Sequence, residues 1–74
     1  MNRPVKRSLT LGGHRTSVSL EDDFWNGLRQ AAADRGMGIN ALAAEIDTAR
    51  QVDIGLATAI RLFVLRYYRD RGRS

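Results

Sequence analysis

The chain has 74 residues, enough for one small domain whose core seldom supplies more than about 3 to 5 kcal/mol of stability. It has no cysteine and one histidine, which excludes disulfides and argues against a zinc site, so oligomerisation is the remaining way to add stability. No stretch has the pattern of a signal peptide or a membrane span, and we expect a soluble, cytoplasmic protein without metal or cofactor.

The net charge of +4 is unevenly distributed along the chain. Residues 1–15 carry four basic side chains and no acidic one, and residues 57–74 carry five basic side chains against one acidic. Residues 16–56 carry three basic side chains against seven acidic. A polyanionic partner would therefore meet the ends of the chain rather than its middle, although solvated basic tails would give the same pattern.

Residues 1–13 lack helical periodicity, contain the only proline and end in Gly12 and Gly13. We expect them to form a flexible basic arm. The alternating run at 8–11 leaves a second interpretation open, in which a short extra strand forms and the two glycines turn the chain back.

Polar and apolar side chains alternate over residues 14–20, which predicts a β-strand with Val18 and Leu20 against a helical core. A single strand is not stable in water, and no second strand is evident downstream. We therefore expect the partner strand to come from another copy of the chain. The resulting antiparallel ribbon has the size to enter a DNA major groove. Three side chains of this strand would face outward: Arg15, Ser17 and Ser19.

Three helices are expected, over residues 21–35, 39–50 and 56–71. Acidic residues open the first, where the positive end of the helix dipole favours them. Gly36 follows it and suits the left-handed C′ position, and Gly38 is an acceptable N-cap for the second.

The helix at 56–71 has one main apolar stripe, but Leu62 and Leu65 fall on the opposite side. Single exposed leucines are ordinary on protein surfaces. Two of them close together on one short helix suggest a further contact, so Leu62 and Leu65 are candidates for a partner-binding surface.

The order of these elements over residues 14–50 resembles the ribbon-helix-helix family of bacterial DNA-binding proteins, of the Arc and MetJ type. The resemblance rests on the alternation at 15–20, on the apolar stripe of the first helix and on the turn at 36–40. The helix at 56–71 is additional to the minimal fold. The fold class implied is mostly α-helical with one β-strand, in an intertwined homodimer with an intermolecular antiparallel ribbon.

The resemblance implies that the ribbon lies in the major groove, with Arg15, Ser17 and Ser19 contacting bases. It also implies that the backbone N–H groups at the start of the second helix contact phosphate, as the open N-terminus of a helix can. The residues concerned are Gly38, Ile39 and Asn40. Lys6 and Arg7, in the basic arm, are further candidates for phosphate contact.

The sequence therefore predicts a DNA-binding homodimer, able to assemble further on DNA, that acts as a transcriptional repressor. The alternative is a protein-interaction module, such as an antitoxin-like or adaptor dimer, that binds a protein partner through the third helix. An enzyme is not expected, because the chain has one histidine, no cysteine and no phosphate-binding glycine motif.

Overall fold

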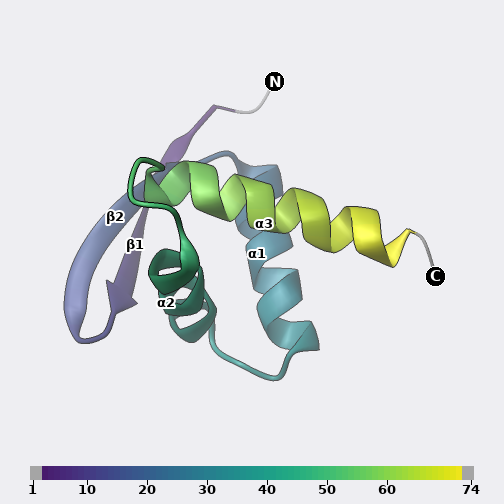
Figure 1. The fold of residues 1–74 in the computed structure, drawn as a ribbon, viewed down its shortest axis with the longest axis horizontal. Coiled ribbons are helices and arrows are strands. Elements are labelled where there is room, and N and C mark those ends of the chain that lie inside the picture. The colour runs from purple at the N-terminus through teal and green to yellow at the C-terminus, as the bar shows by residue number, and fades with distance from the viewer. Residues whose placement is uncertain (1–2, 73–74) are drawn as a thin grey trace.

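The structure, a computed structural model, describes residues 3–72 as a β-hairpin packed on three helices (Figure 1). The hairpin consists of β1 (Val5–Leu11) and β2 (His14–Leu20), and the helices are α1 (Asp22–Asp34), α2 (Ile39–Ala49) and α3 (Leu56–Arg71). β1 lies against α2, and β2 lies against α3. None of the helices within residues 3–72 is long and apolar enough to span a membrane.

The first strand corrects the expectation of a flexible arm at 1–13, because residues 5–11 pair with β2 in an antiparallel hairpin. The pairing with a second chain that the sequence suggested would use the other edge of the strand at 14–20, which thus has one partner within its own chain. The reason lies in the turn, since only Gly12 and Gly13 separate the paired residues Leu11 and His14. Both glycines have positive φ, of 57° and 85°, as a two-residue type I′ hairpin turn requires.

The hairpin has one face toward the helices and one toward solvent. Leu9 of β1 and Val18 and Leu20 of β2 are buried on the inner face, as the period of two in a strand dictates. They join a single core with residues from all three helices. The largest fully buried side chains are Leu9, Leu20, Leu28, Leu42 and Ile60.

The turn between α1 and α2 is set by Gly36, whose φ of +67° is the left-handed conformation expected at that position. The Gly36 N–H donates to the Ala33 carbonyl at 3.0 Å, and the Met37 N–H donates to the Ala32 carbonyl at 3.0 Å. These two bonds form a Schellman motif, which satisfies carbonyls that the helix end leaves open. The chain then enters α2 after the N-cap Gly38.

α3 crosses α1 at a very short distance because Gly27 has no side chain. A Cβ atom built on Gly27 would lie 2.5 Å from Cγ1 of Val64 and 3.2 Å from Cε2 of Tyr68. Both Gly27 and Val64 are buried. The contact therefore sets how closely α3 can approach the rest of the fold.

We expect Gly27→Ala to lower the free energy of unfolding, because overpacking usually costs about 1 to 3 kcal/mol. This loss should exceed the gain in helix propensity, which is about 1 kcal/mol. Urea denaturation would measure it. In a double-mutant cycle, Val64→Ala should recover part of the loss because it removes the clashing methyl groups. An increase in stability of Gly27→Ala alone would contradict the close contact.

Candidate nucleic-acid interface

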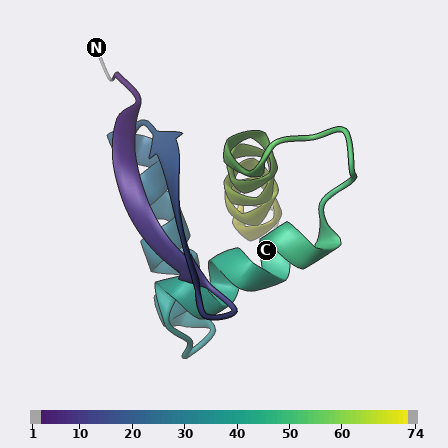
Figure 2. The ribbon, with the colours of Figure 1, turned by 90° about the vertical axis from the view of Figure 1, so that its left-hand side faces the viewer.

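The outer face of the hairpin brings together most of the polar residues that the sequence singled out. The strand register pairs Lys6 with Ser19, Ser8 with Ser17, and Thr10 with Arg15. These six side chains share one face because each strand alternates, and all six residues are exposed. The face contains two cationic side chains and no acidic one. Figure 2 shows the hairpin in front of α1, so that no helix covers this face.

Ser8 and Thr10 were not among the candidates from the sequence. They lie on the outer face because residues 5–11 form a strand rather than an arm. The second interpretation of the sequence, an extra strand followed by a glycine turn, implies this position, because a glycine pair between two alternating runs is typical of a hairpin with a two-residue turn.

Arg7 does not lie with Lys6. Neighbouring residues of a strand point to opposite faces, and Arg7 faces the helices opposite Val18. Its guanidinium forms an ion pair with Asp22 and lies 5.3 Å from the ring centroid of Trp25. Its Nε is buried without a hydrogen-bond partner. The side chain therefore belongs to the contact between β1 and α1 rather than to the outer face.

The start of α2 lies beside the turn end of the hairpin (Figure 2). The Oδ1 atom of Asn40 accepts a hydrogen bond from the Thr10 N–H at 3.0 Å, which ties the helix to β1. No side chain caps the N-terminus of α2, so the first N–H groups after Gly38 have no partner from a cap. Gly38 is exposed, whereas the Ile39 side chain is partly buried against the core.

The end of β2 is held by α3. Arg61 donates from Nε and Nη2 to the two carboxylate oxygens of Glu21, at 2.9 and 3.1 Å, and from Nη2 to the Ser19 carbonyl at 3.2 Å. The bidentate hydrogen bond from Arg61, with a smaller contribution from the Glu21 backbone, lowers the pKa of the Glu21 carboxyl below 4.5. Glu21, which precedes α1, is thereby bound to Arg61 of α3, which lies 40 positions later in the chain.

A carboxyl whose pKa is lower in the folded state than in the unfolded state stabilises the fold at pH values above its unfolded-state pKa. This stabilisation is lost as the pH falls through its folded-state pKa. Arg61→Gln should therefore raise the Glu21 pKa toward its ordinary value and move the midpoint of acid unfolding to higher pH. NMR titration of the Glu21 side-chain carboxyl would measure the pKa, and circular dichroism would follow unfolding. Arg50→Gln is a control that breaks a different ion pair, with Asp47. An ordinary Glu21 pKa in the unmodified protein would contradict the assignment.

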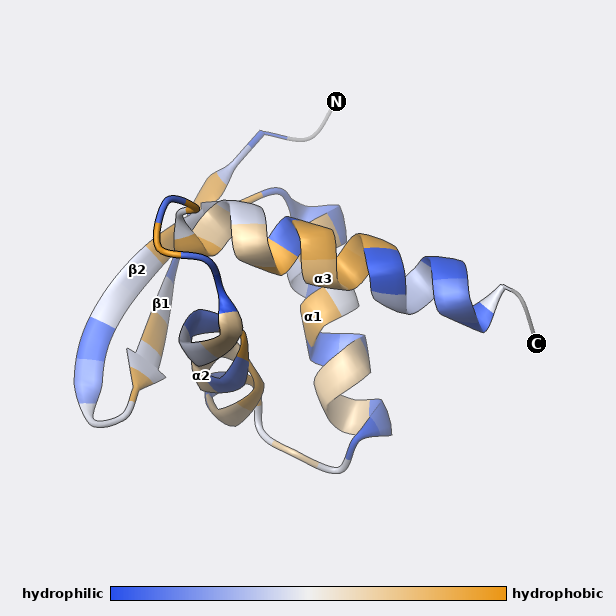
Figure 3. Ribbon diagram, viewed as in Figure 1, coloured by the Kyte–Doolittle hydropathy of each residue, from blue (hydrophilic) through white to orange (hydrophobic). Residues whose placement is uncertain are grey.

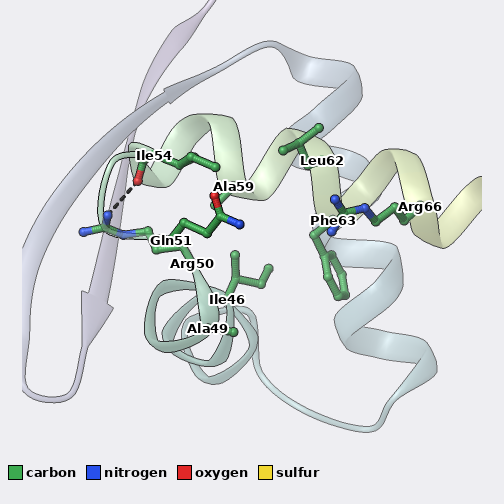
Figure 4. Close-up of a pocket in the computed structure, with 9 residues that line it drawn as sticks. All are labelled: Ile46, Ala49, Arg50, Gln51, Ile54, Ala59, Leu62, Phe63 and Arg66. Carbon is green, nitrogen blue, oxygen red and sulfur yellow. Dashed lines mark hydrogen bonds between the residues drawn. The ribbon is translucent and has the colours of Figure 1, made fainter.

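A second feature is a groove of about 230 Å³ between the end of α2 and α3 (Figure 4). Leu62 and Phe63 of α3 line it together with Ile46 of α2 and Ile54 of the connecting loop. Arg50 holds this loop through hydrogen bonds to Asp47, at 2.7 Å, and to the Ile54 carbonyl, at 2.6 Å.

The structure separates the two leucines that the sequence put together. Leu62 is partly buried and lines the groove, whereas Leu65 is 58% exposed and does not line it. The C-terminal half of α3 is mainly hydrophilic beyond them (Figure 3). Among residues 3–72, no cluster of three His, Cys, Asp or Glu side chains could hold a metal ion.

A family model described as a ribbon-helix-helix domain matches residues 4–68, which includes both strands and most of α3. No curated protein and no solved structure matches the chain.

Proposed function

Because the chain belongs to the ribbon-helix-helix family, we propose that it is a homodimeric, sequence-selective DNA-binding protein that represses transcription by occupying promoter DNA. Proteins of this family are generally DNA-binding transcription regulators or antitoxins, bind DNA typically as dimers, and are not enzymes. We further propose a bacterial source, which rests on the resemblance to bacterial DNA-binding proteins, and a cytoplasmic location, where bacterial chromosomal DNA lies.

The observation that supports this proposal best is the outer face of the hairpin. Its six exposed side chains are cationic or hydroxylic, with no carboxylate to repel phosphate. An antiparallel two-stranded ribbon fits the major groove of B-DNA, which is about 12 Å wide. Arg15 can donate two hydrogen bonds to guanine, whereas Ser17 and Ser19 can donate or accept and discriminate less between bases.

The phosphate contacts in this proposal come from Lys6 and from the start of α2. The open N–H groups that follow Gly38 and the positive end of the helix dipole favour an anion. The role expected for Asn40 involves its backbone N–H, which lies in the first turn of α2, whereas its side-chain oxygen accepts a hydrogen bond from the Thr10 N–H. Arg7 is not included, because it is bound to Asp22.

We expect Arg15→Ala to reduce the preference for selected over random DNA by roughly 10-fold or more, since a bidentate contact contributes about 1 to 3 kcal/mol of discrimination. Fluorescence anisotropy with a random 30-base-pair duplex and with duplexes selected from genomic DNA would measure it at low and physiological salt. Arg29→Ala, which removes the same charge from an exposed position on α1, is the control. An unchanged ratio of affinities for Arg15→Ala would overturn the role of Arg15.

A second candidate function is binding of a protein partner through α3, as an adaptor or an antitoxin-like dimer. The groove beside Leu62 and the exposed side chain of Leu65 support it, because DNA binding by the hairpin requires neither. Val52, in the loop beside the groove, is 99% exposed and adds to the apolar surface. This function is compatible with DNA binding, since the groove lies on helices and the polar face lies on the hairpin.

Leu62→Asp combined with Leu65→Asp should abolish retention of a specific partner from a native lysate without changing DNA affinity. Thr58→Asp is the control, because it adds a negative charge to an exposed position of the same helix without removing apolar surface. Thermal unfolding would verify that both variants are folded. Retention of the same partner by the double variant would contradict a role for this surface.

A further inference from the structure

The two edges of the hairpin differ in what is bound to them. In an antiparallel pair closed by a two-residue turn, the residues that flank the turn exchange hydrogen bonds, and such pairs alternate with non-bonded ones. Leu11 and His14 flank the turn here. The backbone groups of Arg15, Ser17 and Ser19 therefore point away from β1, toward the outer edge of β2.

Contacts on the other elements agree with this assignment. Thr10, paired with Arg15, directs its N–H outward from β1, where Asn40 accepts it. Ser19 directs its carbonyl outward from β2, where Arg61 binds it. The turn half of the β1 edge is thus occupied by α2. The β2 edge is left open at Arg15 and Ser17 in the part of the chain that the structure describes, and an open strand edge is a template for pairing with another strand.

The proposed homodimer can therefore add a second copy at β2 but not at the turn half of β1. Two hairpins joined through β2 make a sheet of four strands. With about 4.8 Å between neighbouring strands, the axes of the two outer strands lie about 14 Å apart. This span exceeds the width of the major groove, which is about 12 Å, before any side chain is counted.

In the proposed function, the two β2 strands enter the groove as a ribbon; we infer that each β1 strand lies outside this ribbon, over the phosphate backbone at the edge of the groove. This inference rests on the proposed function. It assigns Lys6, Ser8 and Thr10 to phosphate rather than base contact, which suits their chemistry, because ammonium and hydroxyl groups are frequent phosphate donors. The open start of α2, tied to β1 through Asn40, extends the same phosphate-binding flank.

The arrangement predicts that substitutions on β1 affect phosphate contacts and that substitutions on β2 affect base contacts. Ser8→Ala with Thr10→Ala should weaken binding to selected and random duplexes by the same factor, about 30-fold or more because each dimer loses four hydroxyl contacts, and leave base preference unchanged. Lys6→Ala should also leave base preference unchanged and should flatten the slope of log K against log salt by about 2, since each dimer loses two phosphate contacts. Ser17→Ala, the matched variant on β2, should change the preferred bases near the centre of the site.

The duplexes for this test come from rounds of selection of a random library with the unmodified protein. Neutral methylphosphonate linkages at the phosphates bordering the groove should weaken DNA binding by the unmodified protein. They should have a smaller effect on DNA binding by the Lys6→Ala variant. Light scattering should find two chains on each site. Thermal unfolding of each variant would verify the fold, which these exposed positions should not affect.

Altered base preference in the Ser8 and Thr10 variant would overturn the inference, because β1 would then lie in the groove. One chain on each site would overturn it too, by excluding the four-stranded sheet. Altered base preference would leave the proposed function intact. One chain on each site would also overturn the homodimeric part of that function, but binding to DNA itself would stand. Failure of the unmodified protein to bind any duplex, even at low salt, would overturn the proposed function itself and the inference with it.

Discussion

The antiparallel pairing of β1 with β2 depends on two adjacent residues, Gly12 and Gly13, that both adopt positive φ. A side chain at either position would cost about 1 to 2 kcal/mol of backbone strain. Without this turn, residues 5–11 would not reach β2, and Leu9 would be missing from the core. The polar outer face would then consist of one strand instead of two.

The helices and the second strand could be predicted from the sequence because their signals are local. Periodicity indicates the apolar faces, and Gly36 ends α1 through its own conformation. For the first strand, the sequence supported two interpretations, a flexible arm and a short extra strand. Basic charge and the single proline favoured an arm over residues 1–13, while the weaker signal, alternation next to a glycine pair, indicated the strand that the structure contains.

The candidate site was predictable only where it follows the alternation of a strand. Arg15, Ser17 and Ser19 are on one face as expected, and their contacts with bases remain a prediction. The same alternation separates Lys6 from Arg7 once both lie in a strand. The bonds between Asn40 and Thr10 and between Arg61 and Glu21 join residues 30 and 40 positions apart, and no local pattern indicates such pairs.

The fixed register of the hairpin also determines which substitutions, insertions and deletions its outer face can accept during evolution. Substitutions at the outer positions of β1 and β2 can alter the chemistry of the face without changing the core, because those side chains are exposed. Inserting or deleting one residue within a strand would move every following side chain to the opposite face, exposing apolar residues and burying polar ones. Relatives could therefore diverge in the DNA they prefer by exchanging residues, while the length of each strand and of the turn stays constant.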